Sequence, residues 1–300
     1  MVSPDTGSTP IIERIHDAVI SGEVSIPPLP EITTRLMTLL GDDSTASATQ
    51  VAEMVHNDPA VAATLLRMAN SAAFGGLRPI SNLSHAIARL GLGQVTSVVT
   101  ALMHQGHFET NDPAKKALLS ALWDHALATA VGTKALSIVA SSDPEEGFLA
   151  GLLHDVGKLL ILKGVDWLED RCGTTVTPVV LAEMMETLHT ELGFHTLTGW
   201  HLPEPICRAA RDHHNDDVIS DDLIEVRVQA ADAIARKLGA HPTPEPDLHL
   251  LQIPAIERMG LGDVELAALM VDLEDEIAEV TQIRLGSTVP ASGPDAPPAG

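Results

Sequence analysis

The sequence predicts an all-α protein, and three observations support this. Apolar residues recur at helical spacing along almost the whole chain, and no alternating polar and apolar run is long enough for a sheet. Aromatic residues make up only 2% of the chain, so Leu, Ala, Val, Ile and Met must form the core, which favours closely packed helices. An apolar content of 45% over 300 residues can bury the core of one large or two ordinary domains.

The N-terminal half of the chain carries explicit helix-start signals. Ser47 and Gln50 form a capping-box pattern, and Asp58 followed by Pro59 supplies an N-cap and a first-turn proline. Two glycines and a proline at 75–79 then interrupt the helical pattern. We expect short helices at residues 47–57, 59–71 and 82–90.

Beyond Asp112 the apolar pattern changes to longer helices. They are expected at residues 113–140, 145–163, 178–200, 204–214, 222–239 and 263–284. The polar segment 106–113 (GHFETNDP) is the best candidate boundary between two lobes. The predicted organisation is a flexible tail at 1–9, an N-terminal helical lobe at 10–110, a second helical lobe at 111–285 and a disordered tail at 286–300.

Charge and cysteine content exclude several classes of protein. The formal net charge is −23, and a surface this acidic repels phosphate backbones and anionic lipids, so we expect no direct nucleic-acid binding and no membrane contact. Cys172 and Cys207 show no CxxC spacing, which indicates neither a disulfide framework nor a thiolate zinc site. No apolar run reaches the roughly 18 residues of a membrane span. We therefore expect a cytoplasmic protein.

The strongest chemical signal is His154-Asp155, within the apolar stretch FLAGLLHDVGKLLIL. Lys158 follows one helical turn later. Burying these groups among leucines costs several kcal/mol unless they pair with each other or bind a metal. Two interpretations remain open for the dyad, a metal site and a buried hydrogen-bonded pair that joins helices. Lys158 could likewise form a salt bridge with Asp155 or contact a phosphate.

Other histidines and carboxylates in helical contexts could join this dyad. His125 follows Trp123-Asp124, His213 and His214 end a predicted helix, and Asp232 lies in an alanine-rich helix. Each of these residues has an ordinary alternative. His125 could be a core or surface histidine, and Asp232 could be a solvated carboxylate. His213 and His214 could simply end a helix, where the helix dipole favours an imidazolium. Without thiolates, imidazole and carboxylate ligands suit Mn, Fe, Zn, Ni or Mg.

These motifs together resemble a known superfamily. HDVGK with an upstream helical His, a downstream His, an HH pair and a late helical Asp resembles the HD metal-dependent phosphohydrolases. The segments IPPLPEI (26–32), NDPAVAATLLRMANSAAFG (57–75) and ISNLSHAIARLGL (80–92) are similar to the HDOD family, its regulatory relatives. With HTELG from His189 and WHLP from Trp200, the resemblance covers about residues 10–240.

The resemblance implies a metal site. His125, His154, Asp155 and Asp232 would hold one divalent ion, His189, His213 and His214 would be available for a second, and Asp155 would bridge the two. Asp155 and Lys158 would be the catalytic residues, with Lys158 neutralising charge on a phosphate. His189 is preferred over His195 because its spacing to WHLP fits the HDOD pattern.

The resemblance also implies the kind of function. HDOD proteins are regulatory output modules, so the expected role is signal transduction through a protein partner, with a metal or a nucleotide as the cue. The alternative is an active metal-dependent phosphohydrolase acting on a nucleotide or phosphoester. His213-His214 is followed by Asn215-Asp216-Asp217 and no GYP motif is present, so a cyclic-dinucleotide substrate is not predicted.

Overall fold

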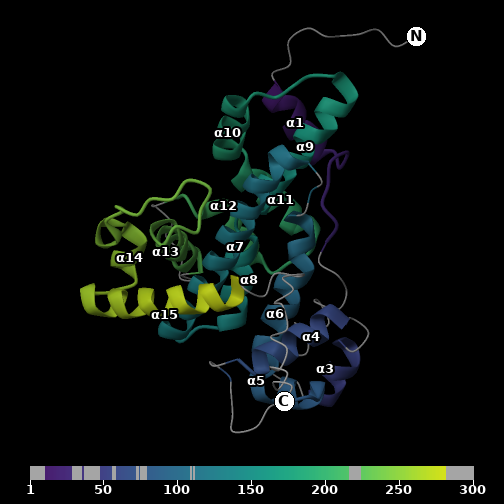
Figure 1. Ribbon diagram of the computed structural model, residues 1–300. Helices are drawn as coiled ribbons and strands as arrows, with labels where there is room; N and C mark the ends of the chain where they lie inside the picture. The colour runs from purple at the N-terminus through teal and green to yellow at the C-terminus, as the bar shows by residue number, and fades with distance from the viewer. Residues whose placement is uncertain are drawn as a thin grey trace, which may run out of the picture.

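The computed structural model of the 300-residue chain describes residues 11–28, 36, 48–55, 59–71, 74, 80–108, 110, 112–215 and 224–281. Within these residues the regular structure is entirely helical, which confirms the predicted all-α class (Figure 1). The predicted tails and the capping residues Ser47 and Asp58 lie outside the described residues.

Four helices in the first part of the chain pack around their own apolar cluster. They are α3 (Ala48–Val55), α4 (Pro59–Ala69), α5 (Leu83–Leu90) and α6 (Leu92–Gln105). Val55, Leu65 and Ile87 are fully buried there. The first three helices confirm the expected short helices with ends that differ by a few residues, whereas α6 was not predicted. Gly91, at φ 81°, allows the chain to turn directly from α5 into α6.

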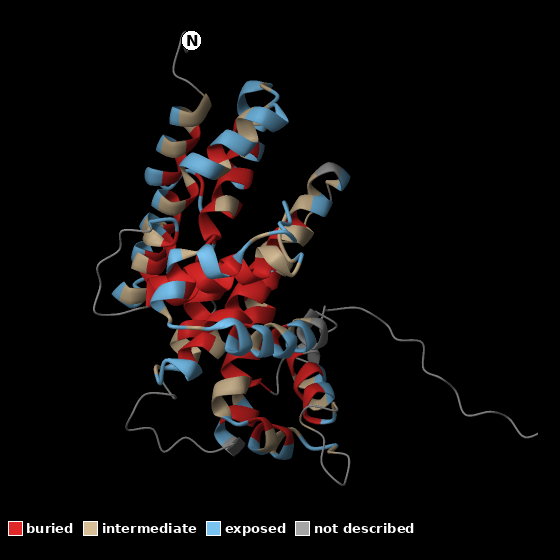
Figure 2. Ribbon diagram, turned by 90° about the vertical axis from the view of Figure 1, so that its left-hand side faces the viewer, coloured by how far each residue is buried: buried red, intermediate tan, exposed pale blue. Residues whose placement is uncertain are grey.

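A larger apolar cluster surrounds the long helix α7 (Pro113–Val139). Packed against α7 are α8 (Pro144–Leu153), α13 (Ile224–Lys237) and α15 (Asp263–Thr281). The remaining helices of this part are α9 (Val156–Cys172), α10 (Pro178–Thr187), α11 (His189–Gly199), α12 (Glu204–Asp212) and α14 (Pro254–Arg258). Figure 2 shows the buried residues concentrated where these helices cross.

The first helix, α1 (Ile11–Ile20), packs against α9 rather than against α3 to α6. Its residues Ile15, Ala18 and Val19 belong to the larger apolar cluster. Ile15 packs directly against Gly164 of α9, where a Cβ would leave no room for it. This contact differs from the expected grouping of residues 10–110 in one lobe. The position of a boundary near residue 110 stays a prediction.

Two of the predicted long helices are broken, and both breaks occur at the chemically interesting residues. The expected helix at 145–163 ends at Leu153 and restarts at Val156, so His154 and Asp155 lie in the turn between α8 and α9. The expected helix at 178–200 breaks at Leu188, which makes His189 the first residue of α11. Apolar periodicity continues across both breaks, so the sequence pattern did not reveal them.

No single helix among the described residues is long and apolar enough to cross a membrane. The pair Leu83–Leu90 and Leu92–Phe108 meets the length and composition criteria only when taken together, and it is bent by 108°.

Candidate metal centre

The close crossing of α7 and α8 brings the first two histidines together. A Cβ on Gly151 of α8 would lie 2.6 Å from the Thr129 carbonyl oxygen and 2.7 Å from the Ala130 Cα, both in α7. Only a glycine permits this approach of the two backbones. His125 on α7 and His154 at the end of α8 are fully buried as a result, with their Nε2 atoms 3.2 Å apart.

The turn between α8 and α9 places two adjacent side chains on the same centre. Successive residues of an unbroken helix point about 100° apart, so His154 and Asp155 could not both face one point from within it. Asp155 instead adopts φ −102° and ψ 14°, and its carboxylate does not cap α9. The Asp155 side chain is therefore free to face the histidines.

One group of side chains forms around His125. Its Nε2 lies 3.1 Å from Asp232 Oδ1 on α13 and 3.5 Å from Asp155 Oδ2. His154 Nε2 lies 3.4 Å from the same Asp155 oxygen. Two helices and one turn thus contribute four potential metal ligands to this group.

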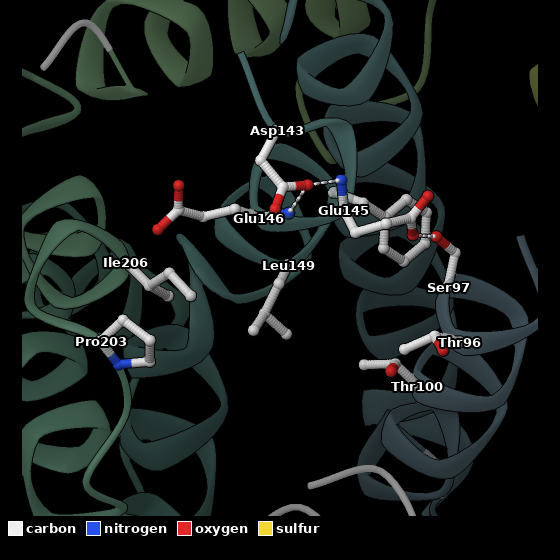
Figure 3. A pocket seen from close by; sticks show the side chains of 10 residues that line it. Thr96, Ser97, Thr100, Asp143, Glu145, Glu146, Leu149, Pro203 and Ile206 are labelled. Carbon is white, nitrogen blue, oxygen red and sulfur yellow. Dashed lines mark hydrogen bonds between the residues drawn. The ribbon is translucent and has the colours of Figure 1, made fainter. Parts of the chain in front are cut away.

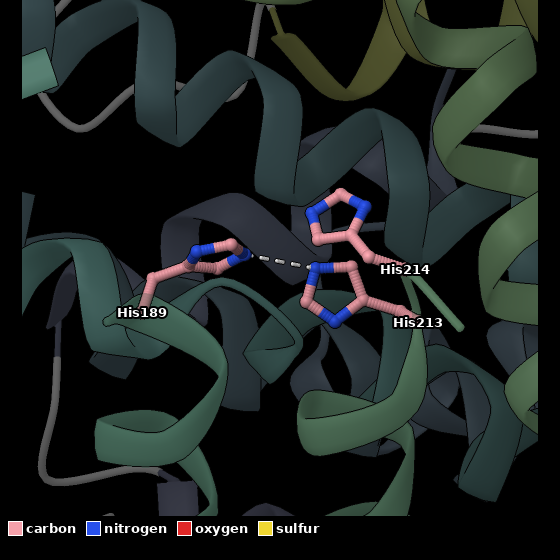
Figure 4. A group of neighbouring side chains, drawn as sticks. All are labelled: His189, His213 and His214. Carbon is pink, nitrogen blue, oxygen red and sulfur yellow. Dashed lines mark hydrogen bonds between the residues drawn. The ribbon is translucent and has the colours of Figure 1, made fainter. Parts of the chain in front are cut away.

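A second group contains His189, His213 and His214, shown in Figure 4. His189 opens α11 and His213 follows α12, and their Nε2 atoms lie 3.2 Å apart. The ring of His214 lies 4.1 Å from that of His213, between ring centroids. His189 and His213 are buried, whereas His214 is exposed.

Asp155 lies between the two groups. Its Oδ2 faces His125 and His154, while Oδ1 lies 3.5 Å from the Nε2 atoms of both His189 and His213. This Oδ1 is buried and accepts no hydrogen bond within the described part of the chain. A carboxylate with one oxygen toward each group has the arrangement of a bridging ligand.

The hydrogen bonds of the His125 and His154 rings show which of their nitrogens are available to a cation. His125 Nδ1 donates to the Ala240 carbonyl oxygen at 2.9 Å, and His154 Nδ1 donates to that of Gly151 at 2.7 Å. Each neutral ring then presents an unprotonated Nε2, and two such lone pairs at 3.2 Å repel unless a proton or a cation lies between them. The donor set fits a divalent metal.

In the second group, the hydrogen bonds among the described residues orient the ring of His213 in this way. His213 Nδ1 donates to the Ala210 carbonyl oxygen at 3.0 Å. His189 Nδ1 is buried without a hydrogen-bond partner among the described residues, so His189 can donate from Nε2 to His213. This group also suits a metal, but the hydrogen bond between His189 and His213 can stabilise the two rings without one.

The carboxylates of the centre are held ionised. Burial alone would raise the pKa of Asp155, but the Lys158 ammonium and His154 hold it well below its usual value. Burial likewise opposes ionisation of Asp232, but the adjacent His125 ring and the Arg236 guanidinium hold the pKa of this carboxyl below its usual value. For His189, burial lowers the pKa to about 3, and Asp155 acts in the opposite direction. Anionic carboxylates and a neutral imidazole are the forms that bind metals.

The structure therefore brings all the predicted site residues together. Lys158 on α9 joins them through an ion pair with Asp155 Oδ2 at 2.5 Å. His195, the alternative to His189, lies exposed on α11, and among the described residues no hydrogen bond or ion pair joins it to the centre. Their roles as ligands and catalytic residues stay predictions.

Sequence reasoning missed one residue at this centre. No motif described above includes His241, but its ring packs edge to face on His125, with 4.6 Å between centroids. The available signal was its position, since it follows the C-terminus of the helix that carries Asp232 by four residues.

A separate cavity of about 380 Å³ lies between α6, α8 and the start of α12 (Figure 3). Its walls carry hydroxyls from α6, carboxylates from the start of α8 and apolar side chains such as Leu149 and Ile206. None of the predicted site residues lines this cavity.

The chain is similar in sequence to one known protein family and to one curated protein. The HDOD domain family matches residues 26–216. A curated protein of unknown function from Treponema pallidum is 25% identical over 215 residues, which cover 68% of this chain and 39% of that protein. The chain thus spans well under half the length of this relative.

Solved structures share the fold. An HDOD domain protein of unknown function from Geobacter sulfurreducens has a TM-score of 0.67 at 23% identity, covering 90% of this chain and 99% of that one. A candidate metal-dependent phosphohydrolase from Shewanella amazonensis has a TM-score of 0.70 at 20% identity, covering 90% and 97%. Since the family match spans more than half of the sequence, the chain belongs to the HDOD domain family.

Proposed function

We propose that this protein is a metal-binding regulatory HDOD module that acts through a protein partner. The observation that carries the metal assignment is the 3.2 Å approach of His125 Nε2 and His154 Nε2, with both Nδ1 atoms donating to backbone carbonyls. Asp155 and Asp232 supply the negative charge that a divalent cation requires. The ligand types suit Mn, Fe, Zn, Ni or Mg.

Two positions are proposed for the metal. His125, His154, Asp155 and Asp232 would hold the first ion, and His189, His213 and His214 would hold the second, with Asp155 within reach of both. A metal bound here supplies Lewis acidity and lowers the pKa of water. The net charge of −23 argues against a nucleic acid as the partner.

Metal analysis of the full chain tests this proposal. After anaerobic reconstitution with Mn²⁺ or Fe²⁺ and desalting, we expect two equivalents per chain in the wild-type protein and a loss of both in Asp155→Asn. His195→Ala is the matched control, because it removes an exposed histidine from α11 and should keep both. Wild-type protein without stoichiometric metal would refute the site. Circular dichroism of each variant separates lost binding from lost folding.

The regulatory part of the proposal requires metal-dependent partner binding. We expect the metal-loaded wild-type chain to bind its partner, and Asp155→Asn to bind it more weakly. Equal binding by wild-type and Asp155→Asn protein would show that the centre does not control the interaction.

A second candidate function, phosphohydrolysis of a nucleotide or phosphoester, is supported by Lys158. Its ammonium lies 2.5 Å from Asp155 and is largely buried, with 14% of the side chain exposed. A cation beside the metal position would stabilise negative charge on a phosphate. Release of phosphate or nucleoside from a substrate panel, abolished by Asp155→Asn and by Lys158→Met, would establish this activity. If metal-replete protein releases neither phosphate nor nucleoside from any substrate in the panel, the hydrolase function is refuted and the regulatory function remains.

A further inference from the structure

The segment after α13 folds back over one side of the candidate metal centre. The amide of Ala240 donates to the Ala235 carbonyl oxygen at 3.0 Å, which reverses the chain at the end of the helix. Lys237 Nζ then donates to the carbonyl oxygens of Pro246 and Leu248, each at 2.9 Å. These bonds hold residues 239–248 in place, and the segment lies beyond residues 26–216 of the family match.

This segment is attached to two of the proposed ligands. The Ala240 carbonyl oxygen accepts the Nδ1 proton of His125, and the next residue, His241, packs its ring on His125. Arg236 connects the same segment to Asp232, with 3.0 Å to the Asp232 carboxylate and 3.1 Å to that of Glu245. The position of His241 beside the centre is therefore set by contacts on both sides of it.

The surroundings of His241 determine where its proton lies. The backbone amide and the hydroxyl of Thr243 both lie 3.0 Å from Nδ1 and can donate to it. The Thr243 carbonyl oxygen, at 2.9 Å, would suit the opposite tautomer. The hydroxyl can donate or accept, so it fits either tautomer. An unpaired backbone N–H is rarer in proteins than an unpaired carbonyl oxygen, which favours an unprotonated Nδ1 that accepts from the amide and puts the proton on Nε2. A ring with a proton on Nε2 is a hydrogen-bond donor rather than a metal ligand.

The neighbouring cations are already engaged with the ligands. Lys158 is paired with Asp155, and Arg236 with Asp232. His241 is half-buried, and its Nε2 has no hydrogen-bond partner among the described residues. A fixed donor of this kind binds an oxyanion with little loss of conformational entropy.

We propose that His241 is a ligand-recognition residue of this centre, which donates from Nε2 to an oxygen of a phosphate-bearing ligand on the side of His125. The inference rests on the proposed metal centre and adds to it a residue outside the HD motif. In this proposal His241 contacts the anion and does not bind the metal.

Titration of inorganic phosphate into the metal-loaded full-length protein tests this role by calorimetry. His241→Phe keeps a ring against His125 but removes the donor, and should weaken phosphate binding about tenfold with metal content unchanged. His241→Gln keeps an N–H donor and should retain most of the affinity. His249→Phe is the matched control, since His249 is exposed and directly follows this segment, and the variant should bind phosphate like the wild type.

The outcomes separate this inference from the proposed function. Wild-type protein without metal refutes the proposed centre, and the role of His241 falls with it. If metal is retained but the wild type binds no phosphate, or His241→Phe binds it as tightly as wild type, only the inference is overturned. Loss of metal in His241→Phe would also overturn it, because His241 would then support the ligands rather than the anion.

Discussion

The Nε2 atoms of His125 and His154 lie 3.2 Å apart, although both rings donate from Nδ1 to backbone carbonyl oxygens. With Nδ1 as the donor, each neutral ring directs the lone pair of Nε2 toward the other ring. A divalent metal between the two atoms would accept both lone pairs, which leads to the first prediction.

His125→Ala and His213→Ala should each remove one metal and leave the other. The two residues belong to separate groups that share only Asp155, so loss of one should cost one equivalent per chain by elemental analysis. Metal should also raise the melting temperature of each variant less than that of the wild type, because a ligand that binds only the folded state stabilises it. Loss of both equivalents in either variant would mean that the two positions are not independent.

Gly157→Ala should disrupt the centre without changing a ligand. A Cβ at this position would lie 1.9 Å from the His189 carbonyl oxygen and 2.7 Å from its carbonyl carbon, so α9 and α11 would have to separate. We expect a loss of about 3 kcal/mol in the free energy of unfolding and weaker binding at the His189 position.

Gly199→Ala provides the control for this substitution. Gly199 ends α11, and a Cβ there would meet no atom within 4 Å. Alanine should therefore be neutral or stabilise the protein by up to about 1 kcal/mol. Equal stability of the two variants in urea unfolding would contradict the close approach at Gly157.

Glu145→Ala should destabilise the contact between α6, α7 and α8. Glu145, which lines the cavity of Figure 3, pairs with Lys134 at 2.7 Å and accepts a hydrogen bond from Ser97. The two charged side chains are only 14% and 18% exposed, so removing the carboxylate leaves the ammonium with the neutral Gln94 and Ser97. We expect a loss of about 2 kcal/mol.

A second substitution identifies the cause of that loss. Lys134→Met combined with Glu145→Ala should recover part of the stability, since no unpaired buried charge remains. If the double variant is as unstable as the sum of the single variants, the ion pair does not account for the effect.

His104 should make stability depend on pH. The ring is fully buried, and both of its nitrogens lack hydrogen-bond partners among the described residues. Burial lowers its pKa to about 3, whereas the unfolded chain has the ordinary value of about 6.5. The unfolded state therefore binds more protons between these values, and stability should fall as the pH decreases below 6.5, by up to about 1.4 kcal/mol per pH unit.

Urea unfolding at several pH values checks this contribution. His104→Leu should have a shallower decrease of stability between pH 6.5 and 4 than the wild type. His85→Leu, at an exposed histidine of α5, should keep the wild-type slope. Identical slopes for wild-type and His104→Leu protein would show that His104 is not the source of the pH dependence.

The sequence by itself determined the helical class and the composition of the centre. Helical periodicity and the low content of aromatic residues can be read directly from the sequence, and they correctly predicted the all-α fold. The motif HDVGK, the HH pair and Asp232 identified residues that the structure does bring together. Such signals are readable because each is confined to a few neighbouring positions.

The tertiary structure decided where helices break and which distant residues meet. The turn at His154-Asp155 lies within continuous apolar periodicity, and both of its side chains face partners on other helices. The contact of His125 with Ala240 joins positions 115 residues apart and brings His241 to the centre. Helix crossings create these relationships, and a crossing depends on the packing of two surfaces that no local sequence pattern contains.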